Sequence, residues 1–169
     1  MIRLATADDL ARITAIYHHY VRHSHATFDL EPFADREEWF SHYGVAPHWV
    51  VVDDELNGYA TSSVFRTKPA YRSTVETSVY VDPEAVGRGL GRALYDDLLA
   101  RLDEAGVHRC VAGIALPNDA SIALHTACGF RPVGTFTEVG FKGRWVDVAW
   151  YGAHFPDSAG TSGSCCRPS

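Results

Sequence analysis

Long apolar runs are missing from this sequence. No stretch approaches the roughly 18 apolar residues that a membrane-spanning helix requires, and the opening Met-Ile-Arg-Leu-Ala-Thr lacks a signal-peptide apolar region. A basic excess is missing too, since 15 Lys and Arg residues stand against 21 Asp and Glu residues, for a net charge of −6. We therefore expect a soluble cytoplasmic protein with neither a nucleic acid nor a membrane as partner. Any anionic ligand must be held by local backbone amides or a few placed cations.

Cysteine is scarce, with four residues in the chain. No C-x-x-C pair and no spacing typical of a zinc site occurs, so we expect neither a disulfide nor a metal. Cys110 and Cys128 lie in apolar sequence typical of buried free thiols. Cys165 and Cys166 are adjacent in a segment of small residues.

What is present suffices for one domain. The hydrophobic fraction of 46% and the aromatic content of 12% are typical of a globular protein with a core, which excludes wholesale disorder. We expect the domain to span residues 1–156 and a disordered tail, without periodicity, to span 157–169.

Hydrophobic periodicity indicates a mixed α/β fold. The predicted helices begin at Thr6, with Asp9 completing a capping box, and cover residues 36–43, 89–104 and 118–129. The predicted strands are 2–5, 48–52, 58–65, 73–81, 110–115, 130–136 and 145–155.

A glycine-rich turn, Gly87-Arg88-Gly89-Leu90-Gly91, separates a strand from a helix. Alternating glycines let backbone N–H groups approach a ligand, and the helix start adds unpaired amides and a positive dipole end. The turn therefore predicts an anion site suited to a pyrophosphate. A tight helix entry without ligand is the alternative. A Walker A loop is excluded because Gly-Lys-Ser/Thr is absent, and the dinucleotide fingerprint has another spacing.

The segment resembles motif A of the GCN5-related N-acetyltransferase (GNAT) family. There a V-x-V strand, matched by Val79 and Val81, pairs with the pantetheine arm of coenzyme A, and the turn matched by Gly87–Arg92 holds its pyrophosphate. Val86 departs from the family's Gln or Arg, and we expect modestly weaker affinity. The resemblance implies a mixed, mostly antiparallel sheet of six to seven strands flanked by about four helices, with acetyl-CoA as co-substrate and no metal.

A second segment, Asn118–Phe130, resembles motif B of the same family, in which Asn contacts the pantetheine or caps a helix. Thr74–Val81, Leu116–Ser121 and Gly140–Val148 resemble the phosphinothricin acetyltransferase-like branch. The implied cofactor contacts are Val79, Tyr80, Val81, Gly87, Arg88, Gly89, Leu90, Gly91, Arg92, Asn118 and Ser121.

Glu76 is the candidate general base, because an attacking amine must lose a proton before it reaches the thioester. A surface strand carboxylate is the alternative. His125 stands where relatives often place a tyrosine that protonates the leaving thiolate; it is a candidate acid or substrate ligand, or a packing residue. The Val79 N–H is the expected oxyanion donor. We expect direct transfer without a covalent intermediate.

Arg66, Lys68 and Tyr71 precede Glu76 and predict a site for an anionic acceptor, although a solvated loop explains the cations equally. The resemblance implies a small amino acid, such as phosphinothricin, methionine sulfone or methionine sulfoximine, acetylated on its α-amine. The predicted acceptor contacts are Phe28, Arg66, Lys68, Tyr71, Glu76, Thr77 and Ser78.

Three questions stay open at this point. The acceptor amine is undetermined, and a polyamine, an aminoglycoside or a peptide N-terminus would be the alternatives within the family. A CoA-binding module without catalysis is the alternative outside enzymes. The branch commonly forms homodimers, for which the aromatic C-terminal strand offers a surface; core packing explains those aromatics equally.

Overall fold

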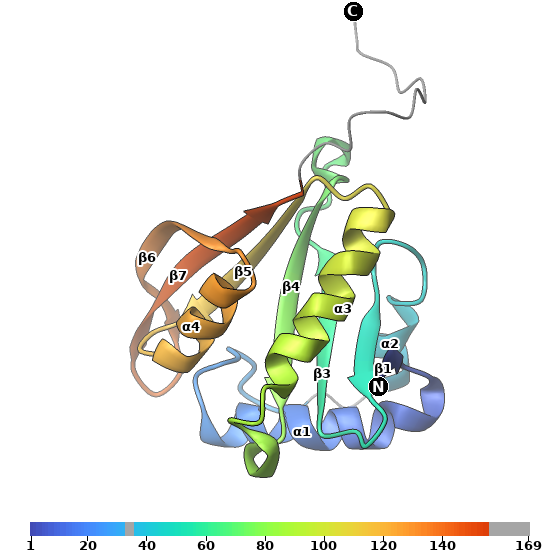
Figure 1. Cartoon of the computed structure of the whole chain (residues 1–169). Helices are drawn as coiled ribbons and strands as arrows, with labels where there is room; N and C mark the ends of the chain where they lie inside the picture. Colours follow the sequence, from blue (N-terminus) through green and yellow to red (C-terminus); the bar gives the residue numbers. More distant parts are fainter. Residues whose placement is uncertain (33–35, 156–169) are drawn as a thin grey trace, which may run out of the picture.

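The structure is a computed structural model that describes residues 1–32 and 36–155. These residues form one seven-stranded sheet, in the order β1-β2-β3-β4-β5-β7-β6, and four α-helices (Figure 1). The strands are β1 (Ile2–Leu4), β2 (Val50–Asp53), β3 (Gly58–Val64), β4 (Thr74–Val81), β5 (Arg109–Ala115), β6 (Arg131–Phe141) and β7 (Trp145–His154). The helices are α1 (Leu10–His23), α2 (Arg36–Ser41), α3 (Leu90–Glu104) and α4 (Asp119–Ala127).

The predicted fold class is confirmed. Within the described residues every strand pairing is antiparallel except that of β4 with β5. The expected tail at 157–169, with Cys165 and Cys166, lies outside the described residues and stays a prediction. No helix in the described part of the chain is long and apolar enough to cross a membrane. The expected cytoplasmic location likewise stays a prediction.

The sheet separates two apolar cores. On one face, α3 buries Leu94, Leu98 and Leu102 completely, as their four-residue spacing predicts, and α4 lies beside it (Figure 1). On the other face, α1 buries Ile13 and Ile16 against β2 and β3, and α2 packs its aromatic residues there. The helices thereby fix both sides of β4, the strand that carries the predicted site.

The start of the first helix follows the predicted capping box. The backbone N–H of Thr6 donates to Asp9 at 2.8 Å, and the two terminal guanidinium nitrogens of Arg3 donate to the same carboxylate at 2.7 and 2.9 Å. Bonding to Arg3 lowers the pKa of Asp9 to about 2. A short 3-10 turn at Ala7–Asp9 precedes α1.

The two parallel strands diverge halfway along β4. They pair only over Thr74–Glu76 and Arg109–Val111; beyond that, β4 stays with β3 and β5 stays with β7. Because successive peptide groups of a strand alternate in direction, part of the backbone of residues 77–81 faces the resulting gap. The divergence therefore leaves main-chain donors and acceptors for a ligand.

The largest difference from the sequence prediction is at β6, which continues to Phe141 instead of ending at residue 136. Two register irregularities, between Pro132 and Gly134 and between Phe136 and Gly140, interrupt its alternation. Periodicity alone misses such a strand, because a bulge shifts the side chains to the opposite face.

Candidate active site

The glycine turn has the conformation that its residues predict. Gly87 and Gly89 have φ values of 82° and 78°, in the left-handed region that glycine adopts without strain. Gly89 is the N-cap of α3, so the first N–H groups of that helix have no partner within it. At Gly91 an added Cβ would lie 3.1 Å from Leu124 of α4. The turn thus fits a pyrophosphate, with α3 and α4 in close contact beside it.

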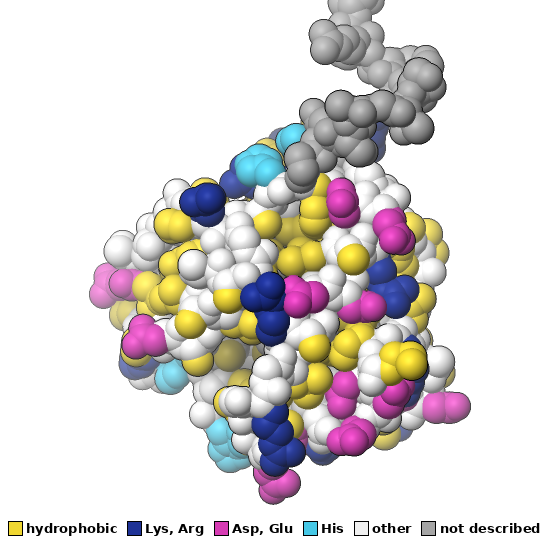
Figure 2. Space-filling view, viewed as in Figure 1, with side chains coloured by type: hydrophobic (Ala, Val, Ile, Leu, Met, Phe, Trp, Pro, Cys, Tyr) yellow, Lys and Arg dark blue, Asp and Glu magenta, His cyan; other side chains and the backbone are white. Residues whose placement is uncertain are grey.

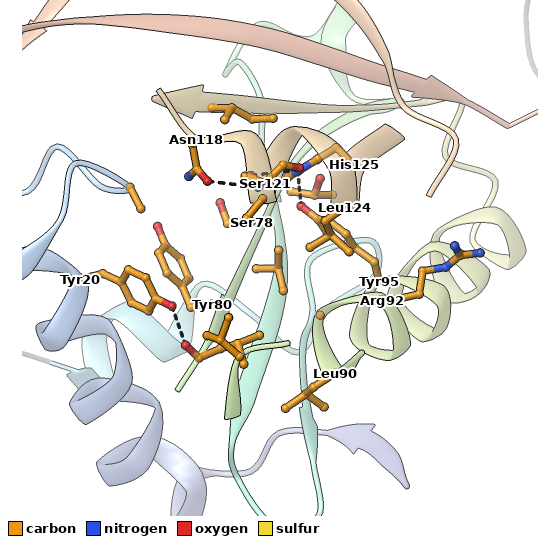
Figure 3. A pocket seen from close by; sticks show the side chains of 18 of the residues that line it. Tyr20, Ser78, Tyr80, Leu90, Arg92, Tyr95, Asn118, Ser121, Leu124 and His125 are labelled. Atoms are coloured by element: carbon orange, nitrogen blue, oxygen red, sulfur yellow. Dashed lines mark hydrogen bonds between the residues drawn. The ribbon is translucent and has the colours of Figure 1, made fainter. Parts of the chain in front are cut away.

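A cleft of about 410 Å³ lies between this turn, β4 and α4, and we call it the turn cleft. Figure 2 shows the surface hollowed between α4 and the start of α3, and Figure 3 shows the side chains that line it. Among the predicted cofactor contacts, those that line it are Val79, Tyr80, Val81, Gly87, Gly89, Leu90, Gly91, Arg92, Asn118 and Ser121. Arg88 does not; it is exposed, and its guanidinium donates to the Glu84 carbonyl at 2.9 Å.

Asn118 caps α4. Its Oδ1 accepts from the backbone N–H of Ser121 at 3.1 Å, as Figure 3 shows. One of the two roles considered for Asn118 is therefore seen directly. Because the residue also lines the turn cleft, a second role toward a ligand stays open to its free amide donors.

A buried polar network joins α3 to α4 at the floor of the turn cleft (Figure 3). His125 Nδ1 lies 2.7 Å from the Ser121 carbonyl, and His125 Nε2 lies 2.9 Å from the Tyr95 hydroxyl. A carbonyl only accepts, so the neutral ring carries its hydrogen on Nδ1 and the hydroxyl of Tyr95 donates to Nε2. Burial lowers the pKa of His125. Its single N–H is therefore already bonded, and the ring is neutral at physiological pH.

Helix α1 anchors the end of β4 from the opposite face. The Tyr20 hydroxyl donates to the Val81 carbonyl at 2.5 Å, and Arg12 pairs with Asp82 at 2.5 Å. Asp82 in turn accepts from the N–H of Glu84 at 2.8 Å, at the start of the glycine turn. These bonds fix the position of the turn relative to the sheet.

A second cleft, of about 540 Å³, contains Glu76 and is called the carboxylate cleft. Glu76, Ser78 and Tyr80 alternate on one face of β4 and line this cleft together. Burial raises the pKa of Glu76, and the charge of Arg66, also in the lining, opposes that rise. A carboxylate with a raised pKa is a better proton acceptor from an ammonium group than an exposed one.

The two clefts meet where β4 and β5 diverge. Both clefts are lined by Ala26, Ser78, Tyr80, Gly113 and Ala115. A group held in the turn cleft can therefore reach one held in the carboxylate cleft, beside Glu76. This is the geometry that transfer between two bound molecules requires.

The strap, residues 24–29, covers the meeting point. The Lys142 ammonium donates to the Thr27 carbonyl at 2.9 Å, His25 Nε2 donates to the Lys142 carbonyl at 3.1 Å, and the Tyr17 hydroxyl donates to Asp29 at 2.5 Å. The strap is thus bound both to α1 and to the β6–β7 turn. Through it Phe28 joins the lining of the carboxylate cleft.

The structure separates the predicted acceptor residues into two groups. Phe28, Arg66, Glu76 and Ser78 line the carboxylate cleft together. Lys68 and Tyr71 do not line it; Lys68 is exposed, and the Tyr71 ring packs on Phe65 at 5.8 Å between centroids. Thr77 is buried and faces the turn cleft, because successive side chains of a strand point to opposite faces.

Sequence reasoning missed the walls that distant strands provide. Strands β6 and β7 add Phe136, Val139, Gly140, Phe141, Val148 and Trp150 to the carboxylate cleft, and the strap adds Thr27. Tyr20, Tyr95 and Leu124 are additional in the turn cleft. Alternation along β7 marked Val148 and Trp150 as one face, but no local signal told which face lines a cleft. No group of three or more His, Cys, Asp and Glu residues able to hold a metal occurs within residues 1–32 and 36–155.

Comparison with known proteins gives concordant matches. The profile of the acetyltransferase (GNAT) family matches residues 13–130. The chain is 49% identical to phosphinothricin N-acetyltransferase of Streptomyces coelicolor over 159 residues, which cover 89% of this chain and 93% of the relative. It is 39% identical to the L-methionine sulfoximine/L-methionine sulfone acetyltransferase of Salmonella typhimurium, over 88% of this chain and 91% of the relative.

A solved structure matches as well. The GNAT superfamily phosphinothricin acetyltransferase of Sinorhizobium meliloti, solved in complex with acetyl-CoA, superposes with a TM-score of 0.87 at 36% identity. The match covers 97% of this chain and 92% of that one.

Proposed function

The chain belongs to the GNAT family of acetyl-CoA-dependent N-acetyltransferases, in its phosphinothricin N-acetyltransferase branch. From this we propose that it acetylates the α-amine of a small amino-acid-like acceptor. The acceptor is of the phosphinothricin, methionine sulfone or methionine sulfoximine type. The observation that carries this proposal is the meeting of the two clefts beside Glu76.

Acetyl-CoA occupies the turn cleft. The pyrophosphate lies on the N–H groups of residues 87–92, where helix α3 begins and its dipole favours an anion. The pantetheine arm follows the free edge of β4 at Val79–Val81 and takes the backbone partners that β5 leaves there. The arm brings the thioester toward the residues shared by both clefts.

Glu76 acts as the general base, directly or through a water. An amino-acid amine is protonated at neutral pH, and it becomes a nucleophile only after it transfers a proton. Burial raises the pKa of Glu76, which makes the carboxylate a stronger base. The free amine then attacks the acetyl carbonyl, and the Val79 N–H stabilises the oxyanion.

Arg66 is the cation of the acceptor site, because it lines the carboxylate cleft together with Glu76. A guanidinium binds a carboxylate or a phosphinate by two parallel hydrogen bonds. Lys68 and Tyr71 lie outside that lining and have no part in the proposed acceptor site. Phe28 supplies an apolar contact from the strap.

His125 acts as a positioning residue in the turn cleft, on the side where the CoA thiolate leaves. As a neutral ring whose N–H is bonded to the Ser121 carbonyl, it has no proton to release toward a thiolate. Its role in this proposal is to hold α4 and the Tyr95 hydroxyl in position. The amine nitrogen loses its second proton to solvent as the amide forms, and the departing CoA thiolate takes up a proton from solvent.

The proposal is tested by measuring CoA release from acetyl-CoA with a panel of amines. Acetylation of phosphinothricin or methionine sulfone, with spermidine and kanamycin inactive, supports it. Preferred acetylation of a polyamine or an aminoglycoside would show a different GNAT acceptor. Acetyl-CoA binding without release by any amine would show a binding module.

The base assignment has its own test, Glu76→Gln. This variant keeps the size of the side chain and loses the basic group, so kcat at pH 7 is expected to fall by about 10²–10⁴-fold. Binding of acetyl-CoA is expected to stay unchanged, since Glu76 does not line the turn cleft. Wild-type activity in Glu76→Gln would remove the assignment.

We also propose that two copies associate through β6. This edge strand exposes Phe136 by 60% and Phe141 by 57%, with Val133, Val139 and the adjacent Trp145 also more than half exposed. An apolar edge of this length is a site for association. Light scattering of the wild type should give the mass of a dimer, and Val133→Lys should give a monomer. A monomeric wild type at micromolar concentration would contradict the proposal.

A further inference from the structure

Two glycines line the carboxylate cleft where any other residue would change its shape. Gly113 lies on β5 directly opposite Trp150 of β7, and Gly140 lies near the end of β6. We propose that these glycines select the acceptor by size. Gly113 leaves space at the floor of the cleft beside Trp150, and Gly140 leaves space for the ring of Phe28, which forms the roof of the cleft. The inference rests on the proposed function and names the residues that set its specificity.

The floor follows from what a side chain at position 113 would meet. A Cβ added to Gly113 would lie 3.3 Å from Val148 Cγ1 and 3.5 Å from Trp150 Cζ2. Val148 and Trp150 line the carboxylate cleft and not the turn cleft. A side chain at 113 therefore takes space in the carboxylate cleft, beside Val148 and Trp150.

The neighbourhood of Gly113 supports the same conclusion. Ala115, the next residue on the same face of β5, is also small and also lines the cleft. Glycine inside a strand weakens it, and close approach of a ligand to the backbone is one reason for a glycine at such a position. Gly113 is exposed, although its neighbours Ala112 and Ile114 are buried.

The roof depends on a closer contact. A Cβ added to Gly140 would lie 2.3 Å from Cε1 and 2.6 Å from Cζ of Phe28, so the ring cannot stay where it is. The strap has further attachments, at Lys142 and at Tyr17, that do not involve this ring. A side chain at 140 therefore displaces the ring of Phe28 while those attachments remain available.

Together the two positions define opposite effects on one cleft. A methyl group at 113 narrows the floor, and a methyl group at 140 opens the roof. With both glycines in place, the cleft accepts a compact, unbranched side chain, such as that of methionine sulfone, and rejects an aromatic one. Arg66 and Glu76 engage the carboxylate and the amine, which every amino acid presents, so the selection lies at the side chain.

The test compares kcat/KM for L-alanine, L-methionine sulfone and L-phenylalanine in the full chain. In Gly113→Ala the ratio of methionine sulfone to alanine is expected to fall by about tenfold, the lower end of what one methylene contributes to selectivity. In Gly140→Ala the ratio of phenylalanine to methionine sulfone is expected to rise by about tenfold. The KM for acetyl-CoA should be unchanged in Gly140→Ala, because Gly140 does not line the turn cleft.

Gly134→Ala is the matched control. Gly134 is on β6 like Gly140, an added Cβ there meets no atom within 4 Å, and the residue lines neither cleft. Two further variants keep the test decisive if a glycine variant fails to fold. Phe28→Ala should reproduce Gly140→Ala, and Val148→Ala should change selectivity in the direction opposite to Gly113→Ala.

The outcomes separate the two levels of the argument. If the wild type acetylates amino acids but the variants keep its ratios, the glycines do not set specificity and the proposed function stands. If the wild type acetylates no amino acid, the proposed function fails and the inference fails with it.

Discussion

The variant Tyr95→Phe removes one hydroxyl from the buried network at the floor of the turn cleft. It distinguishes a network that positions α4 from one that donates a proton to the leaving thiolate. The Tyr95 ring is completely buried, and its hydroxyl donates to His125 Nε2 at 2.9 Å. Phenylalanine keeps the ring and leaves that nitrogen without its donor. A buried acceptor left unsatisfied costs about 1–3 kcal/mol, so the free energy of unfolding should fall by that amount.

Catalysis should respond much less. If the network only positions α4, kcat should fall by less than about tenfold, whereas a proton donor to the thiolate contributes about 10²–10⁴-fold. The assays are urea unfolding at pH 7.5 and the pH profile of kcat with methionine sulfone. Tyr59→Phe, which removes a buried phenol from the other core, serves as the control.

One result would refute this reasoning. A loss of a hundredfold or more in kcat, with unfolding free energy and acetyl-CoA affinity like those of the control, would mean that Tyr95 serves the leaving group. The pH dependence adds a second check. Burial lowers the pKa of His125, so the unfolded chain binds more protons and stability should decline as pH falls below about 6.5. His125→Asn should remove part of that decline.

Three further expectations concern other parts of the site and fold. Gly89→Ala forces a left-handed conformation on alanine, at roughly 1 kcal/mol of strain, and should weaken acetyl-CoA binding by about tenfold, measured by calorimetry. The control is Gly143→Ala, at a glycine with a similar φ of 72°, which should leave the affinity unchanged. Arg12→Gln frees Asp82 and should raise the KM for acetyl-CoA several-fold without lowering kcat; an equal loss in both would contradict an anchoring role. Because bonding to Arg3 lowers the pKa of Asp9 to about 2, its stabilisation is present above about pH 4 and lost as pH falls toward 2. Asp9→Asn should therefore lower the free energy of unfolding by about 2 kcal/mol at pH 7 and by much less at pH 2, measured by urea unfolding.

The elements that sequence predicts well are those whose signals are local. The leucine spacing of α3, the glycine-rich turn before it and the cap at Asn118 each depend on residues a few positions apart. The mixed sheet follows from the order of such elements and from the family resemblance. The roles of Glu76 and of the other site residues stay predictions, although the structure places Glu76 in a cleft.

What could not be predicted depends on register between distant segments. His125 bonds to Tyr95, 30 residues away, which no helical periodicity indicates. Lys68 and Tyr71 precede Glu76 closely in sequence, yet they lie before β4 begins and do not line the cleft that Glu76 lines. Conversely, Gly140 meets Phe28 only because the bulged β6 brings its far end under the strap.

The divergence of β4 from β5 has a thermodynamic consequence. Part of the main chain of β4 faces a gap. In the binding mode proposed above, the co-substrate completes the sheet there as a missing strand between two protein strands. Folding and cofactor binding are then linked: acetyl-CoA at 100 times its Kd adds about 2.7 kcal/mol to the free energy of unfolding. Since main-chain groups make those bonds, side chains along the edge can vary while the cofactor stays the same. The melting temperature of this chain should therefore report the CoA supply around it.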